Sequence, residues 1–298
     1  MKGKRGMNSD HIRFGPAGNS DSFYQQGHKH TIDTPAWLRA LGLDAFEYSF
    51  GHGVRMGAET ALAIRAAAQA ADVRLSVHLP YFINLAVEGA EKREKNLRYF
   101  LEGLRAAQAM GARRAVFHPG SGKGDRPAIL ARARAFLKEI MACLEAEGLL
   151  EGLTLCVETM GKINQLGSLE EVIALCGADA RLWPAVDFGH LHCRGLGAIR
   201  GRADYAAILD ALEQGLGMER ARTMHIHFSR MEYTLGGEKM HHTLADTQYG
   251  PEFEPLAREL AHRGYAPVVI CESRGTQAED AALLRAIYGA ALGGPGQK

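Results

Sequence analysis

The chain has 298 residues, of which 46% are hydrophobic and 23% charged. This composition is typical of soluble globular proteins and excludes a wholly disordered or collagen-like chain. Lys and Arg number 35 against 34 Asp and Glu, so the formal net charge is +1 and there is no global basic excess that would indicate nucleic-acid binding. Any contact with DNA must therefore come from a local surface.

The cysteine and hydropathy patterns indicate a cytoplasmic protein. The five cysteines are scattered, without a C-x-x-C pair, which is typical of a reducing compartment. No apolar run reaches the roughly 18 residues of a membrane span, so no membrane partner is predicted. The basic N-terminus lacks the apolar segment of a secretory signal. We expect residues 1–10 to form a flexible arm and residues 11–298 to form one catalytic domain.

Short apolar runs alternate with longer amphipathic segments. The runs are typical of parallel strands buried on both faces, and they cover residues 12–15, 43–50, 73–79, 114–118, 153–158, 182–187, 222–228 and 267–272. The segments expected to be helical are 34–41, 58–71, 91–110, 126–147, 168–176, 204–216, 252–263 and 276–292. Eight strand–helix units predict a (β/α)8 TIM barrel, with a doubly wound open sheet as the alternative fold.

Six consecutive predicted strands carry side chains that can bind a metal ion at or near their ends. These residues are His78, His118, Glu158, Asp187, the pair His225 and His227, and Glu272. In a barrel the carboxyl ends of the strands meet at one face, where active sites lie. Carboxylates and imidazoles crowded into one pocket would be desolvated at high cost unless cations neutralised them. The nitrogen and oxygen donors suit Zn²⁺, Mn²⁺ or Fe²⁺.

Two clusters in connecting segments are further candidates for the same pocket. His190 follows Asp187 by three residues, and Glu238 and His241 lie in the long connection after the seventh strand. His192 and His227 are candidates for supporting the metal ligands rather than binding a metal themselves. The glycine-rich segments 51–57 and 120–124 lack the spacing of dinucleotide and P-loop motifs, so no nucleotide cofactor is predicted.

Several of these motifs together resemble the endonuclease IV family, the AP endonuclease family 2 of the xylose-isomerase-like barrels. The motifs are His78-Leu-Pro-Tyr-Phe-Ile-Asn-Leu85, Phe117-His-Pro-Gly120, Val157-Glu-Thr159, Val186-Asp-Phe-Gly-His190, Met224-His225 and Cys271-Glu-Ser273. They occur in order from about residue 73 to residue 275. The resemblance implies a zinc-dependent hydrolase of the deoxyribonuclease IV type, which cleaves double-stranded DNA 5′ to abasic sites in base-excision DNA repair.

The resemblance also implies a role for each matching residue. His78 and His118 would bind one zinc ion, Glu158 would bridge it to a second ion bound by Asp187, His225 and Glu272, and His190 and His241 would bind a third. Glu158 and Glu272 would orient the attacking water in metal-assisted hydrolysis. Tyr81 matches a tyrosine that the family inserts beside the flipped-out abasic site.

The chain departs from the family pattern at three places, one of which is the segment Phe14-Gly-Pro-Ala-Gly-Asn-Ser20, which differs from the family's first-strand loop. The family's third-zinc loop reads D-x-H, whereas here Lys239 stands two residues before His241 and Glu238 three before. Glu238 is therefore the candidate carboxylate, and we expect the third site to bind more weakly than the other two. The seventh strand reads His-x-His-Phe-Ser, where better-known members read His-x-Asn-Asp.

Two other functions stay open. Glu158, Asp187, a histidine of the seventh strand and Glu272 also resemble the single-metal tetrad of ketose epimerases, so a sugar isomerase or epimerase is the main alternative. A barrel that binds DNA or a partner without turnover is the second. The histidines outside the tetrad favour a polynuclear site, and the number of bound ions would separate the three functions.

Overall fold

Eight parallel strands form a single sheet in this computed structural model, which describes residues 11–293; the arm predicted at residues 1–10 lies outside the described residues. The strands are β1 (Arg13–Pro16), β2 (Ala45–Ser49), β3 (Arg74–His78), β4 (Arg114–Phe117), β5 (Thr154–Glu158), β6 (Leu182–Asp187), β7 (His225–Phe228) and β10 (Val268–Cys271). Their order in the sheet is β1-β10-β7-β6-β5-β4-β3-β2.

The two edge strands of this order, β1 and β2, meet and close the sheet into a barrel. The backbone N–H of Asp44 donates to the carbonyl of Phe14 at 3.1 Å, and that of Gly18 donates to the carbonyl of Glu47 at 2.9 Å. Ala17 and Glu47 form a parallel bridge across the seam. The predicted TIM barrel is thereby confirmed, and the open doubly wound sheet is excluded because its edge strands would not touch.

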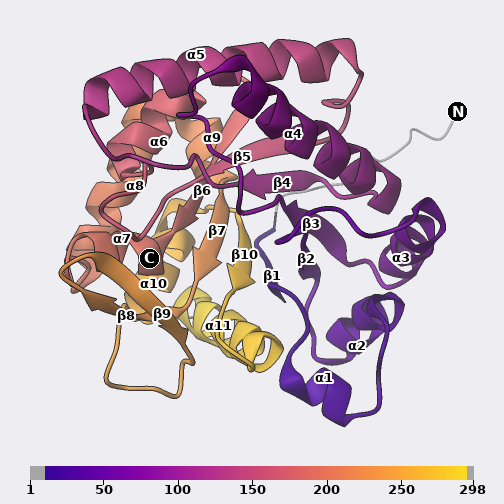
Figure 1. Cartoon of the computed structure of the whole chain (residues 1–298). Helices are drawn as coiled ribbons and strands as arrows, with labels where there is room; N and C mark the ends of the chain where they lie inside the picture. The colour runs from indigo at the N-terminus through magenta and orange to yellow at the C-terminus, as the bar shows by residue number, and fades with distance from the viewer. Residues whose placement is uncertain (1–10, 294–298) are drawn as a thin grey trace, which may run out of the picture.

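Helices surround the barrel on its outside (Figure 1). The main ones are α2 (Thr34–Ala40), α3 (Ala58–Ala70), α4 (Ala90–Met110), α5 (Arg126–Ala146), α6 (Leu169–Cys176), α8 (Arg202–Leu216), α10 (Glu254–Arg263) and α11 (Gln277–Leu292). Each lies within about two residues of its predicted bounds. Ser168 caps α6 and accepts a hydrogen bond from the Glu171 N–H, as its capping-box sequence predicts.

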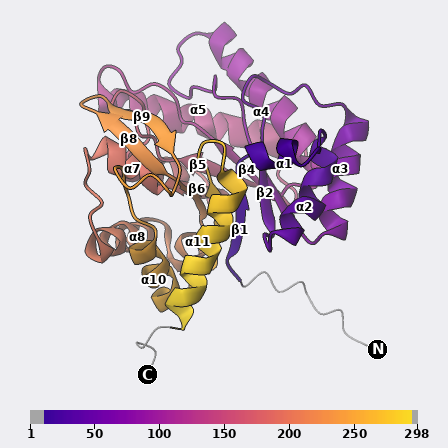
Figure 2. The ribbon, with the colours of Figure 1, turned by 90° about the horizontal axis from the view of Figure 1, so that it is seen from below.

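Several short elements lie in segments that the sequence pattern leaves irregular. They are α1 (Asp21–Gln25), the 3-10 helix η1 (Thr31–Asp33), α7 (Phe188–Arg194), α9 (Met218–Arg222) and the antiparallel hairpin of β8 (Arg230–Thr234) and β9 (Gly237–His242). The hairpin packs against α7, and Figure 2 shows β8, β9 and α7 next to one another. Its polar strands lack the apolar alternation that would predict them.

Alternation of side chains along the strands places the polar residues inside the barrel. On β5, Leu155 and Val157 face the helices, whereas Cys156 lies in a small apolar group inside the barrel. Glu158 follows Cys156 by two residues and therefore also points inward. The inward apolar side chains belong to two groups, Ala45 with Val268 and Ile270, and Val116 with Cys156 and Ala185.

None of the helices within residues 11–293 is long and apolar enough to cross a membrane. All five cysteines lie in this part of the chain, and each is a free thiol.

The seam between β1 and β2 depends on Gly15. A Cβ atom at this position would lie 1.8 Å from the carbonyl oxygen of Ala45, which is backbone and cannot move aside. We predict that Gly15→Ala lowers the free energy of unfolding by about 3 kcal/mol, the upper end of the usual effect of overpacking. Urea denaturation would measure this. Gly289→Ala in α11, where nothing lies within 4 Å, is the matched control and should not destabilise the protein. Equal unfolding midpoints for the two variants would contradict the prediction.

Candidate metal centre

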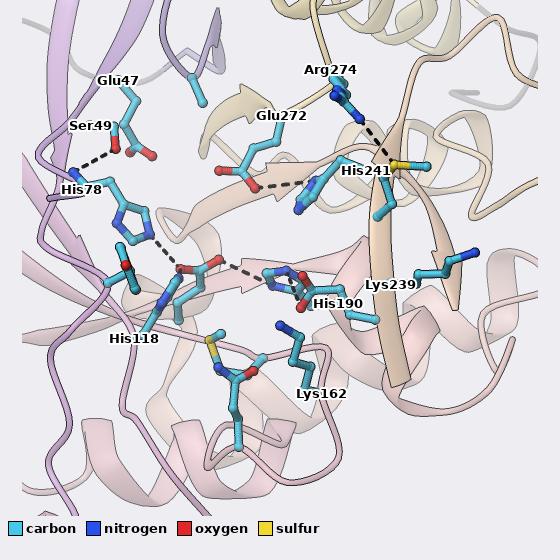
Figure 3. Close-up of a pocket in the computed structure, with 18 of the residues that line it drawn as sticks. Glu47, Ser49, His78, His118, Lys162, His190, Lys239, His241, Glu272 and Arg274 are labelled. Carbon is cyan, nitrogen blue, oxygen red and sulfur yellow. Dashed lines mark hydrogen bonds and ion pairs between the residues drawn. The ribbon is translucent and has the colours of Figure 1, made fainter. Parts of the chain in front are cut away.

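A cavity of about 760 Å³ opens at the carboxyl ends of the strands. Figure 3 shows side chains from distant parts of the chain pointing into it: Glu47 of β2, His78 of β3, His118 after β4, His190 of α7, His241 of β9 and Glu272 after β10. The barrel topology brings them together because parallel strands all end at the same face.

Glu158 occupies the centre of this cavity floor with 1% of its side chain exposed. Its Oε2 atom lies 3.0 Å from Nε2 of His78 and 3.0 Å from Nε2 of His118. Its Oε1 atom lies 3.1 Å from Nδ1 of His227 and 3.4 Å from Nδ1 of His190. One buried carboxylate thus faces four imidazole rings, two on each oxygen.

The ligand-type atoms in and beside the cavity fall into four groups, each spanning no more than 4.8 Å. The groups are His78 with His118 and Glu158; Glu158 with Asp187, His227 and Glu272; His190 with Glu238 and His241; and Glu47 with His225 and His227. Glu158 belongs to the first two groups, so a carboxylate bridge between two ions is possible at this residue.

Backbone and hydroxyl groups hold three of the rings in place. Nδ1 of His78 lies 2.9 Å from the carbonyl of Leu79, and Nδ1 of His190 lies 2.9 Å from the carbonyl of Thr159. A carbonyl accepts only, so each of these Nδ1 atoms carries the proton and leaves Nε2 free to bind a cation. Nδ1 of His241 pairs with the Ser229 hydroxyl at 2.8 Å.

The electrostatics of the cluster favour ionised carboxylates. Burial would raise the pKa of Glu158, but the nearby charges of His118 and His227 and hydrogen bonds to the rings hold it well below its usual value. Burial would lower the pKa of His78, but its hydrogen bond to Glu158 and the charge of that carboxylate raise it to about 9. The His78 ring therefore carries a proton that a divalent cation would replace.

The residues present fit a divalent cation. Asp187 is fully buried, and its Oδ1 accepts the His190 N–H at 2.7 Å, while its Oδ2 lies 3.4 Å from Nδ1 of His190 and has no hydrogen-bond partner within residues 11–293. A buried carboxylate oxygen without a partner is costly and calls for a cation. Carboxylate oxygens and imidazole nitrogens without thiolates suit zinc, manganese or iron.

Residues 35–287 match the family of xylose isomerase-like TIM barrels. Endonuclease 4 of Thermus thermophilus is 31% identical over 199 residues, which cover 64% of this chain and 68% of that protein. The chain belongs to the endonuclease IV family. An uncharacterised protein of Methanocaldococcus jannaschii is 32% identical over 252 residues, covering 84% of this chain and 89% of that protein.

Solved structures of an endonuclease IV and of an epimerase-like protein share this fold. Endonuclease IV of T. thermophilus superimposes with a TM-score of 0.67 at 24% identity over 94% of this chain and 99% of that one. A D-tagatose 3-epimerase-like protein superimposes with a TM-score of 0.70 at 17% identity over 95% of this chain and 98% of that one. At these identities the likeness concerns the fold alone.

On β7 of this endonuclease IV family member, the structure and the sequence resemblance differ. His227, which we predicted to support the ligands, lies both in the group of Glu158 and Glu272 and beside Glu47. His225, predicted to belong to the group of Glu158 and Glu272, lies in the group of Glu47 and His227 instead. Both rings point inward because they are two residues apart, but only His227 lies at the strand's carboxyl end, opposite Asp187. His192, the other predicted supporting residue, is buried against Tyr233 and joins none of the groups.

The departure from D-x-H in the third group is compensated by an irregularity of the hairpin. Glu238 pairs with Tyr233 and Met240 pairs with Glu232, so Lys239 between them has no partner in the register. On a regular strand, residues three apart point to opposite faces. The unpaired Lys239 shifts the alternation by one residue, so the side chains of Glu238 and His241 lie on the same face of the hairpin. Their ligand-type atoms, together with that of His190, lie within 4.8 Å of one another.

Glu47 and two cations at the rim of the cavity, Lys162 and Arg274, were not predicted from the sequence. Glu47 is buried on a mostly apolar strand, and a charged residue two positions from the apolar Ala45, on the same face, is the signal that could have found it. Lys162 and Arg274 line the cavity but belong to none of the motifs, whereas Lys239, which also lines it, stands in the third-zinc loop. Tyr81 lies at the mouth with half of its side chain exposed.

If the unpaired Lys239 is what lets Glu238 and His241 share one group, deleting this residue should not disrupt the group. Deleting Lys239 leaves Glu238 and His241 two residues apart on a regular strand, so both stay on one face and the number of bound metal ions should not change. His241→Ala removes a ligand and should lower the stoichiometry by about one ion. Elemental analysis of the purified variants would measure both. Loss of an ion from the Lys239 deletion, with the barrel still folded, would contradict the explanation.

Proposed function

We propose that the protein is a metal-dependent phosphodiesterase that cleaves DNA on the 5′ side of abasic sites. The proposal rests on one observation. The group of Glu158, Asp187, His227 and Glu272 is accompanied by His78 and His118, and by a further group of His190, Glu238 and His241. Two or three ions, expected to be zinc, with manganese or iron as alternatives, would occupy these groups. The similarity to endonuclease 4 supports a DNA substrate.

Divalent ions bound in these groups would neutralise charge at the phosphate and activate water. Glu158 has one oxygen toward each of two groups, so it would hold the ions of these two groups at a fixed separation. Glu272 is 19% exposed, and its carboxylate lies 3.6 Å from Nδ1 of His227 and 3.9 Å from Nδ1 of His241. From this place between two groups it would orient the attacking water. Lys162 and Arg274 at the rim add positive charge suited to DNA phosphates.

An exposed aromatic surface beside the cavity supports recognition of an abasic site. The rings of Tyr81 and Phe82 lie 4.1 Å apart, and His52 lies 5.4 Å from Tyr81. The side chains of Tyr81 and Phe82 are 50% and 46% exposed. An aromatic side chain can replace the stacking that a missing base no longer provides. An abasic nucleotide is also unpaired and therefore cheap to extrude.

Sugar isomerisation or epimerisation is the second candidate function. The group of Glu158, Asp187, His227 and Glu272 supports it, because these four residues could serve a single metal ion without the other two groups. The two functions predict different results with purified protein. The nuclease binds two or three ions and cuts an abasic-site duplex in a chelator-sensitive reaction, whereas the epimerase binds one ion and leaves the duplex intact.

Glu158→Gln should reduce cleavage of an abasic-site duplex by more than about 100-fold and lower the metal content, because a neutral amide bridges two cations poorly. Steady-state cleavage and elemental analysis would measure the two effects, with circular dichroism to verify the fold. Glu259→Gln is the matched control, since Glu259 is also buried but pairs with Arg202 and Arg263 outside the cavity. Near-normal cleavage by Glu158→Gln would exclude the bridging role.

Tyr81→Ala should weaken binding to an abasic-site duplex by about 1–3 kcal/mol, the usual value of one base–aromatic stacking contact. Its metal content should stay at the wild-type level, because Tyr81 belongs to none of the ligand groups. Tyr81→Phe keeps the ring and is the control. Fluorescence anisotropy with abasic and intact duplexes would measure the affinities. Equal affinity of Tyr81→Ala and wild type for the abasic duplex would remove the stacking role.

A further inference from the structure

Glu47 lies behind His227, on the side of the ring away from the proposed metal centre. Nε2 of His227 is 2.9 Å from Oε1 of Glu47, whereas Nδ1 on the other side of the ring is 3.1 Å from Oε1 of Glu158. One imidazole thus separates two carboxylates. His227 is fully buried and Glu47 is 1% exposed, so water cannot replace either contact.

The second oxygen of Glu47 is held from two further strands. Ser76 of β3 donates its hydroxyl to Oε2 at 2.8 Å, and Nε2 of His225 on β7 lies 3.0 Å from the same atom. The ion-pair partners of Glu47 among residues 11–293 are these two histidines, with no Lys or Arg. The carboxylate is therefore fixed in position, and its negative charge is directed at His227 and His225.

We propose that Glu47 is a positioning residue for the metal bound by His227. A neutral imidazole that binds a cation through one nitrogen must carry its proton on the other. The carboxylate of Glu47 stabilises that proton on Nε2, which leaves Nδ1 of His227 free toward Glu158 and Glu272. The negative charge behind the ring also makes Nδ1 a stronger ligand.

His225 and Ser76 act one step further from the metal, through Glu47. Nε2 of His225 lies 3.0 Å from Oε2 of Glu47, and the Ser76 hydroxyl donates to the same oxygen, so both groups help to hold the carboxylate beside His227. The inference rests on the metal centre of the proposed function, but it holds for either substrate, a phosphodiester or a sugar.

Glu47→Gln tests the role, because it keeps the shape of the side chain and removes its charge. Stripped full-length protein would be titrated with Zn²⁺ in competition with a chelator, and with Co²⁺ by visible absorption. The variant should bind the same number of ions as wild type, with one of them bound 10- to 100-fold more weakly, the usual effect of losing such a partner. The Co²⁺ spectrum should change, which a general loss of stability would not cause. Glu259→Gln should match the wild type in affinity and spectrum.

Two results would overturn the positioning role. Unchanged affinities and an unchanged Co²⁺ spectrum in Glu47→Gln would show that the charge behind His227 has no effect. Loss of one whole ion, with the others at wild-type affinity, would show instead that Glu47 binds a separate ion together with His225 and His227, whose ligand-type atoms span no more than 4.8 Å.

Ser76→Ala serves if Glu47→Gln does not fold. It removes one hydrogen bond to Glu47 and leaves the charge, so the same ion should bind more weakly by a smaller factor. Wild-type affinity for all ions in Ser76→Ala would overturn the positioning role.

These titrations do not depend on DNA cleavage. Wild-type protein that binds ions, loses affinity on Glu47→Gln and does not cut abasic DNA would refute the nuclease alone. A nuclease whose Glu47→Gln variant keeps full affinity would refute the positioning role alone.

Discussion

The buried carboxylate of Glu158 is the constraint around which the rest of the site is arranged. A charge with 1% exposure is unfavourable unless opposite charge surrounds it, and here four imidazole rings lie within 3.4 Å of its two oxygens. Those rings come from four different parts of the chain and meet only when the barrel is closed. The arrangement that compensates Glu158 also brings together groups of side chains that could hold metal ions.

The barrel meets this constraint by dividing its interior into two zones. Small apolar side chains such as Cys156 and Ala185 fill the part below the site, and polar side chains two residues further along the same strands form the cavity floor. The period of two along each strand allows both zones without any irregular backbone. Helices cover the other face of every strand, so the polar residues face one another and not the hydrophobic core.

The ligand groups of this chain are arranged around a shared centre. The four-residue group of Glu158, Asp187, His227 and Glu272 could hold one ion. His78 and His118 extend it toward β3 and β4, while the β8–β9 hairpin adds Glu238 and His241 from outside the barrel. A comparison of folds alone cannot separate a nuclease from an epimerase, since both superimpose on this chain over more than nine-tenths of its length.

The sequence by itself determined the barrel and most of the cavity residues, because eight apolar runs alternate with helical segments and polar residues recur at the strand ends. The fold and these residues can be predicted because the pattern is formed by residues that are close together in the sequence. Three features depended on the tertiary structure. The placement of His227, and not His225, beside Glu158 follows from strand register, and the approach of Glu238 to His241 follows from the unpaired Lys239. The place of Glu47 follows from closure of β2 onto β1 and β3. Each is set by pairing between distant segments, which the order of residues along one strand does not encode.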